Sequence, residues 1–112
     1  MNFYDKIHEL ARSLKETNEY KEYIKLKDEL KSDSATYNMI KDFKEKQTEH
    51  QIKYLNGQEV TKEEQDNMQN LYSILIQNEK ARTLLECEMK INVLLADMQK
   101  IMGDAIKEIV EF

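Results

Sequence analysis

The hydrophobic pattern is strongest in the last third of the chain, where apolar side chains recur at helical spacing from residue 79 to residue 110. A seven-residue repeat that opens at Leu84 lines up one set of apolar side chains, and a second set follows three residues later. A third set lies one residue further round and widens the stripe. The predicted seam consists of Leu84, Cys87, Ile91, Leu94, Leu95, Met98, Ile101 and Met102. We therefore predict one long amphipathic helix that packs through this seam within the chain or against a second copy.

Four shorter helices are predicted before the long one, over residues 3–15, 19–31, 35–55 and from 62 to about 77. The strongest boundary is the third one, where Asn56-Gly57 gives a turn signal and Thr61 with Glu64 forms a capping box. The other helix starts carry side chains that accept hydrogen bonds from free backbone N–H groups: Asn2, Asp33 and Asn78. In the second helix the pattern predicts burial of Tyr20, Tyr23, Ile24 and Leu30, with Leu26 at the edge of the stripe.

Composition supports an all-α protein. The 112 residues include no proline and two glycines, and 35% of them are charged, which is typical of helices joined by short turns. We expect a single helical domain over residues 1–112, an elongated bundle of about five helices. A helix of some thirty residues is about 45 Å long, whereas a compact monomer of this size has a radius of gyration of about 13 Å. An elongated bundle or a dimer resolves this mismatch, and we favour a homodimer.

Charge and hydropathy exclude two classes of partner. A net charge of −5 with interleaved acidic and basic side chains argues against direct nucleic-acid binding, which depends on clustered Lys and Arg. The longest unbroken apolar run, Val93 to Ala96, is far too short for a membrane span. One cysteine cannot form an internal disulfide. The expected location is therefore the cytoplasm.

No residue pattern indicates catalysis, a metal or a cofactor. Cys87 has Glu86 and Glu88 beside it, and carboxylates raise a thiol pKa, so we interpret it as a small buried seam residue. Neither His8 nor His50 has a second His or a Cys three or four residues away, the spacing that places two metal ligands on one helix face. We predict that the protein is not an enzyme and has no cofactor.

Contacts with other proteins are the remaining candidate chemistry. Tyrosine combines a large contact area with a polar tip, and methionine adapts to irregular surfaces. The candidate partner contacts are Tyr37, Met39, His50, Tyr54 and Met89. These residues are proposed only as contact residues, without a chemical role.

Several short strings, in the same order along the chain, resemble the YlbF/YmcA-like bacterial proteins and most closely their YheA-like branch. The matching strings are Asn2-Phe3-Tyr4-Asp5, Glu19-Tyr20 to Leu30, Asp42-Phe43 with Gln47, Gly57 leading into Thr61-Lys62-Glu63-Glu64, and Leu94-Leu95-Ala96-Asp97-Met98. The resemblance covers essentially the whole chain. It implies an all-α homo-oligomer that acts as a non-catalytic regulator of competence, sporulation and biofilm formation.

The resemblance also implies partners. Relatives form a complex that modulates an endoribonuclease acting on messenger RNA, so other family members and such an enzyme are the expected partners. Some of those relatives hold iron–sulfur clusters through cysteines. A four-iron cluster needs about four thiolates, and this sequence has one cysteine per chain. We therefore expect no cluster here.

Three functions stay open at this point. The first is a regulator or adaptor that acts through helix-face contacts, and an apolar face buried between two chains would favour it. The second is a small-ligand-binding or metal-binding helical bundle that uses His50, Tyr54 or Cys87, and a polar cavity lined by them would favour it. The third is a purely structural homo-oligomer, which the sequence does not separate from the first.

Overall fold

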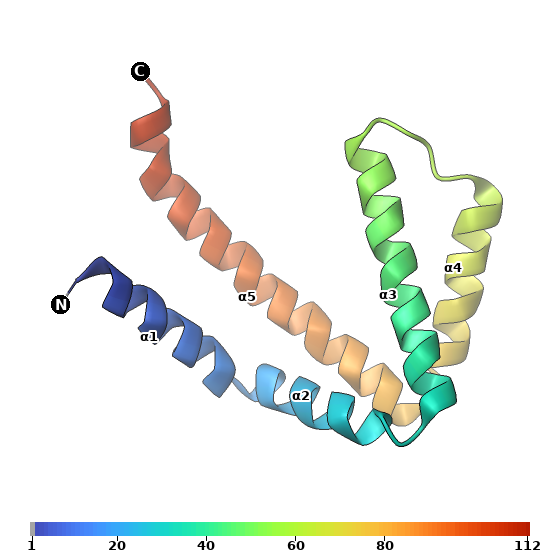
Figure 1. Cartoon of the computed structure of the whole chain (residues 1–112). Coiled ribbons are helices and arrows are strands. Elements are labelled where there is room, and N and C mark those ends of the chain that lie inside the picture. Colours follow the sequence, from blue (N-terminus) through green and yellow to red (C-terminus); the bar gives the residue numbers. More distant parts are fainter. Residues whose placement is uncertain (1) are drawn as a thin grey trace. The chain divides into compact units, whose positions relative to one another are not determined.

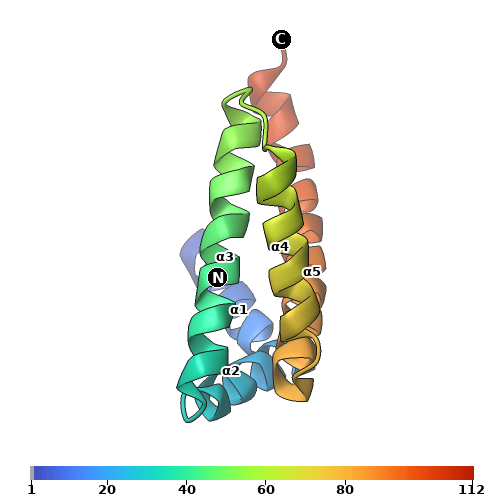
Figure 2. The same ribbon diagram turned by 90° about the vertical axis from the view of Figure 1, so that its right-hand side faces the viewer.

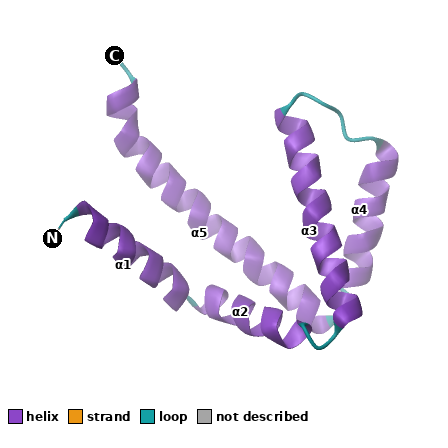
Figure 3. Ribbon diagram, in the orientation of Figure 1, coloured by secondary structure: helices purple, strands orange, loops and turns teal. Residues whose placement is uncertain are grey.

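The computed structural model describes residues 2–112, which form helices joined by short loops and contain no strand (Figure 3). The five helices are α1 Phe3–Glu16, α2 Asn18–Leu30, α3 Ser34–Leu55, α4 Lys62–Leu75 and α5 Glu79–Val110 (Figure 1). The all-helical prediction and the long C-terminal helix are both confirmed.

The predicted cap residues hold the helix starts. Asn2 Oδ1 accepts a hydrogen bond from the backbone N–H of Asp5 at 2.9 Å, and Asn78 Oδ1 accepts one from Ala81 at 3.0 Å. Asp33 likewise accepts from the backbone N–H of Thr36 at the start of α3, at 3.2 Å. These side chains satisfy N–H groups that a helix start leaves without an internal partner.

Close backbone contacts divide the described chain into two compact units. We call residues 25–84 the hairpin unit, and residues 2–24 with 85–112 the arm unit. The hairpin unit holds α3, α4, the end of α2 and the start of α5. The arm unit holds α1, the start of α2 and the rest of α5.

The hairpin unit contains most of the buried apolar side chains. Its helices α3 and α4 run side by side, joined by residues 56–61 (Figures 1 and 2). Leu30 and Leu75 are only 2% and 1% exposed, and the rings of Phe43 and Tyr72 meet with centroids 5.8 Å apart. The buried set is Leu26, Leu30, Ile40, Phe43, Leu75, Ala81 and Leu84. Burial of each leucine contributes about 1.5–3 kcal/mol, so these residues provide the main stabilisation of this unit.

One detail of the predicted core of α2 is wrong. Ile24, expected inside, is exposed, whereas Leu26, expected at the edge, is buried. Leu26 and Leu30 are four residues apart and share a helix face, and Ile24 lies almost opposite Leu26 at 100° per residue. The side of α2 that is buried within the hairpin unit therefore differs from the side that the periodicity of the whole helix suggests.

The arm unit buries far less. No residue of α1 is buried, although its apolar side chains recur at helical spacing. The buried apolar side chains of this unit are Leu85 and Cys87, both at the beginning of its part of α5. Figure 1 shows α1 and the second half of α5 running apart toward their free ends. The apolar stripes of both helices therefore remain largely exposed.

Candidate functional site

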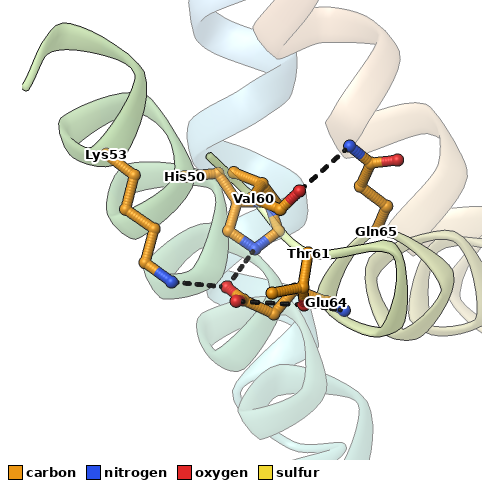
Figure 4. A network of polar contacts seen from close by, with 6 residues as sticks. All are labelled: His50, Lys53, Val60, Thr61, Glu64 and Gln65. Atoms are coloured by element: carbon orange, nitrogen blue, oxygen red, sulfur yellow. Dashed lines mark hydrogen bonds and ion pairs between the residues drawn. The ribbon is translucent and has the colours of Figure 1, made fainter. Parts of the chain in front are cut away.

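The looped end of the α3–α4 hairpin is fastened by a polar network centred on Glu64 (Figure 4). Its Oε2 accepts a hydrogen bond from Lys53 Nζ at 2.7 Å, across from α3 to the first turn of α4. The Thr61 hydroxyl donates to Glu64 Oε1 at 3.1 Å and accepts from the Glu64 backbone N–H at 3.1 Å. The hydrogen bond from Lys53, with those from Thr61, holds the pKa of the Glu64 carboxyl below its usual range.

The capping box predicted here is only half formed. Thr61 caps α4 as expected, but the Glu64 carboxylate bonds to Lys53 instead of returning to the backbone N–H of the cap residue. A capping box is read from residues three apart, whereas the Lys53 partner lies on another helix. The sequence spacing therefore identifies the cap but not this tie between helices.

His50 and the connecting loop complete the network. His50 Nε2 lies 3.9 Å from Glu64 Oε2, close enough for an ion pair when the imidazole is protonated. Gln65 Nε2 donates to the carbonyl oxygen of Val60 at 3.5 Å. These contacts hold the loop ends against α4 and so position the end of the hairpin.

Three exposed apolar side chains lie in the last turn of α3, next to this network, and point to different sides of the helix. Tyr54 is 80% exposed, and Ile52 and Leu55 are also exposed. We call Ile52, Tyr54 and Leu55 the hairpin tip. The turn that follows is fixed by Gly57, whose φ of +72° lies in the left-handed region that favours glycine. The hairpin tip therefore consists of exposed apolar side chains that precede a turn fixed by glycine.

The predicted contact residues differ in exposure. Tyr54 and Met89 are exposed, whereas Tyr37, Met39 and His50 are half-buried. Tyr54 and His50 share the end of the hairpin, and Met89 lies in the arm unit. Ile52 and Leu55 are not among the predicted contact residues, although Ile52 lies nine residues after Phe43 and therefore on the side of α3 opposite that buried ring.

The chemistry of Cys87 is that of a buried thiol. Burial raises its pKa, the carboxylates of Glu22, Glu19 and Glu86 raise it further, and Lys90 opposes them. A raised pKa leaves less of the reactive thiolate at neutral pH. Within residues 2–112, no three or more His, Cys, Asp or Glu side chains are grouped to hold a metal ion. Of the residues considered for a ligand site, His50 and Tyr54 share the hairpin unit, while Cys87 belongs to the arm unit.

The predicted seam of α5 changes character along its length. Leu84 and Cys87 are buried, and Ile91, Leu95 and Met98 are half-buried. Leu94, Ile101 and Met102 are exposed, and Ile101 is 69% exposed. The seam therefore begins in packed structure and continues as open apolar surface.

Comparison with known proteins gives one family. Residues 3–107 match the family model described as "Control of competence regulator ComK, YlbF/YmcA". The chain belongs to the YlbF/YmcA family. This confirms the resemblance seen in the sequence, and the family's description associates it with regulation.

Relatives of this chain include several UPF0342 proteins. That of Symbiobacterium thermophilum is 40% identical over 103 residues, which cover 92% of each chain. That of Desulfitobacterium hafniense is 38% identical and covers 97% of this chain and 88% of its own. That of Bacillus licheniformis is 30% identical and covers 97% and 93%. The similarity thus extends over nearly the full length on both sides.

None of the described helices is both long enough and apolar enough to cross a membrane. α5 has the required length, but charged side chains interrupt it from its first turn to its last.

Proposed function

We propose that this YlbF/YmcA family member is a non-enzymatic regulatory adaptor that works through protein–protein contacts made by its helices. Its partners are further copies of itself, other family members and an endoribonuclease. The observation that carries this proposal is the hairpin tip, where Ile52, Tyr54 and Leu55 are exposed on a helix end that the Glu64 network fastens. Rigid, exposed aromatic and aliphatic side chains are the usual anchors of protein interfaces.

The chemistry of the titratable groups supports the same proposal. The thiol of Cys87 is buried with a raised pKa, and the Glu64 carboxylate is already paired with Lys53. A nucleophile or general base needs an accessible group with its pKa tuned toward neutrality. Neither group meets this requirement, whereas a contact surface needs only exposed side chains held in place.

The test is an affinity pull-down with tagged protein from a Gram-positive bacterium, comparing wild type with Tyr54→Ala. We expect wild type to recover another YlbF/YmcA family member or an endoribonuclease, and Tyr54→Ala to lose it. Tyr4→Ala is the matched control, because Tyr4 is also a well-exposed tyrosine but belongs to the arm unit. Recovery of nothing beyond the protein itself, or equal recovery by Tyr54→Ala, would contradict the proposal.

A further inference from the structure

The turn that ends α3 is held by two backbone hydrogen bonds around Gly57. The Gly57 N–H donates to the carbonyl oxygen of Tyr54 at 3.1 Å, and the Gln58 N–H donates to that of Lys53 at 2.8 Å. Together with the left-handed φ of +72° at Gly57, these bonds form a complete Schellman motif, in which Asn56 is the C-cap residue. Asn56 is exposed, and apart from its chain neighbours no atom lies within 4 Å of the place that a Cβ on Gly57 would occupy. Water therefore reaches this turn.

Asn56-Gly57 is the one Asn-Gly pair in the sequence, and such a pair can react within the chain. The backbone nitrogen of Gly57 bonds to Cγ of Asn56 and gives up its proton, while the bond from Cγ to Nδ2 breaks and ammonia leaves. The product is a five-membered succinimide ring. Glycine permits this attack best because it has no Cβ beside the nitrogen. Water then opens the ring, at Cγ to give aspartate or at the main-chain carbonyl to give isoaspartate.

The folded turn hinders this reaction in two ways. Ring closure requires the Gly57 nitrogen to eclipse Cβ of Asn56 about the Cα–C bond, whereas the ψ of 5° at Asn56 makes it eclipse the Asn56 nitrogen instead. The Gly57 nitrogen must also lose its proton, which the folded turn holds in the hydrogen bond to Tyr54. The reaction therefore requires the turn to open and to break both bonds of the motif. Two such bonds favour the closed turn by roughly tenfold to a hundredfold.

Lys53 links this turn to the Glu64 network. Its carbonyl oxygen accepts the hydrogen bond from Gln58, and its Nζ donates to Glu64 Oε2 at 2.7 Å. One residue thus holds the turn through its backbone and α4 through its side chain. Loss of the bond to Glu64 is therefore expected to free the end of α3 and to let the turn open more often.

We infer that Asn56 is a deamidation site, and that opening of the turn at Gly57, which Lys53 restrains, sets the rate of the reaction. Either product places a carboxylate at the C-terminal end of α3, where the helix dipole disfavours negative charge. Isoaspartate also adds a carbon atom to the main chain, which disrupts both hydrogen bonds of the motif. Deamidation therefore loosens the turn that follows the hairpin tip, and it does so irreversibly. The inference goes beyond the proposed function and does not depend on it, because the reaction takes place within one chain.

Incubation of the full chain in water enriched in heavy oxygen, followed by peptide mass spectrometry, tests the inference. In the folded chain we expect heavy oxygen at Asn56 and none at Asn67 or Asn70, which are exposed in α4 but precede larger residues. In guanidinium chloride, which unfolds the chain, the rate at Asn56 is expected to rise roughly tenfold to a hundredfold. Equal rates in the folded and the unfolded chain would overturn the control by the turn. An unfolded chain that takes up no heavy oxygen at Asn56 would overturn the site itself.

Lys53→Met tests the link between the turn and α4. It keeps an apolar stem and removes the amino group that bonds to Glu64, so we expect deamidation of the folded variant to be about twofold to fivefold faster than in wild type. Lys62→Met is the matched control, because it removes a lysine at the same end of the hairpin and leaves the bond between Lys53 and Glu64 intact. Circular dichroism is used to verify that both variants keep wild-type helicity. Equal deamidation rates in the two variants would overturn the restraint by Lys53.

Discussion

The hairpin unit and the arm unit are made of similar amphipathic helices, yet the first buries many of its apolar side chains and the second leaves most of them exposed. In the hairpin unit Leu26 and Leu30 of α2 and Leu75 of α4 are buried, while in the arm unit α1 buries nothing and the second half of α5 is largely exposed. α5 runs through both units with one unbroken seven-residue pattern, from buried Leu84 to exposed Ile101. The pattern identifies which side of a helix is apolar, but it does not say what covers that side.

The largest expected effect is on the free energy of unfolding, and it distinguishes the core residue Leu75 from its exposed neighbour Ile74. Leu75→Asp leaves a charge buried without a partner, at about 3–5 kcal/mol, and loses about 1.5–3 kcal/mol of burial. Because a domain is stable by only about 5–15 kcal/mol, we expect the cooperative unfolding transition to be severely weakened or lost in urea titrations followed by circular dichroism. Ile74→Asp is the control, since Ile74 is exposed and surface changes cost about 0.5 kcal/mol or less. Equal midpoints for the two variants would contradict the assignment of the hairpin core.

Replacing an apolar residue of the arm unit by Asp is expected to change the Kd of the dimer and not the stability of the fold. Ile101→Asp and Leu94→Asp place a carboxylate on surface that is already exposed, so helicity and the unfolding of the isolated chain change little. In the dimer that carboxylate is buried, at about 3 kcal/mol or more, which raises Kd at least about hundredfold. Sedimentation equilibrium measures this shift. A folded variant whose Kd equals that of wild type would show that Leu94 and Ile101 lie outside the dimer interface.

A smaller difference is expected between the thiol reactivities of two positions in α5, the buried Cys87 and the exposed position 89. Because burial and nearby carboxylates raise the pKa of Cys87, its thiolate is scarce at pH 8. We expect iodoacetamide to react at least about tenfold more slowly with Cys87 than with Met89→Cys in a Cys87→Ala background. Met89 is two residues away and exposed. Similar alkylation rates would mean that Cys87 is accessible and ionised.

The smallest expected effect is a loss of stability of the hairpin unit at acidic pH. Hydrogen bonds lower the pKa of Glu64, chiefly through Lys53, and that of Asp33 through Thr36. A carboxyl whose pKa is lower in the folded state stabilises that state above its unfolded pKa and loses this contribution as the pH falls through the folded value. Both groups belong to the hairpin unit, so its stability should decline below about pH 4. Glu64→Gln removes one titrating group and should lose less stability between about pH 5 and pH 3. An identical pH profile would rule out the Glu64 tie.

Local signals were sufficient to predict the helices but not their neighbours. Asn2, Asp33 and Asn78 cap helices because the interaction spans three residues and can be read directly from the sequence. The tie between Lys53 and Glu64 depends on the approach of two helices, so no spacing in the sequence indicates it. The burial of Leu26 and the exposure of Ile24 depend in the same way on which side of α2 meets other helices.

The candidate surfaces show the same limit. Tyr54 could be chosen from its residue type, and it is exposed at the end of α3. Ile52 could also have been chosen, because nine residues separate it from buried Phe43 and place it on the opposite side of α3. Leu55 could not, because its exposure depends on the turn that follows it. The seam of α5 was predicted as one continuous stripe. Its division into a buried beginning and a largely exposed second half is visible only in the folded structure.

The most direct test of the central claim is the molecular mass of the wild-type chain in solution, measured by sedimentation equilibrium from about 1 to 100 μM, the range in which an interface of standard size associates. We expect a two-fold assembly with twice the 13.4 kDa mass of one chain. A mass of one chain throughout that range would contradict it, because the apolar surface of the arm unit would then be left without a second copy to cover it.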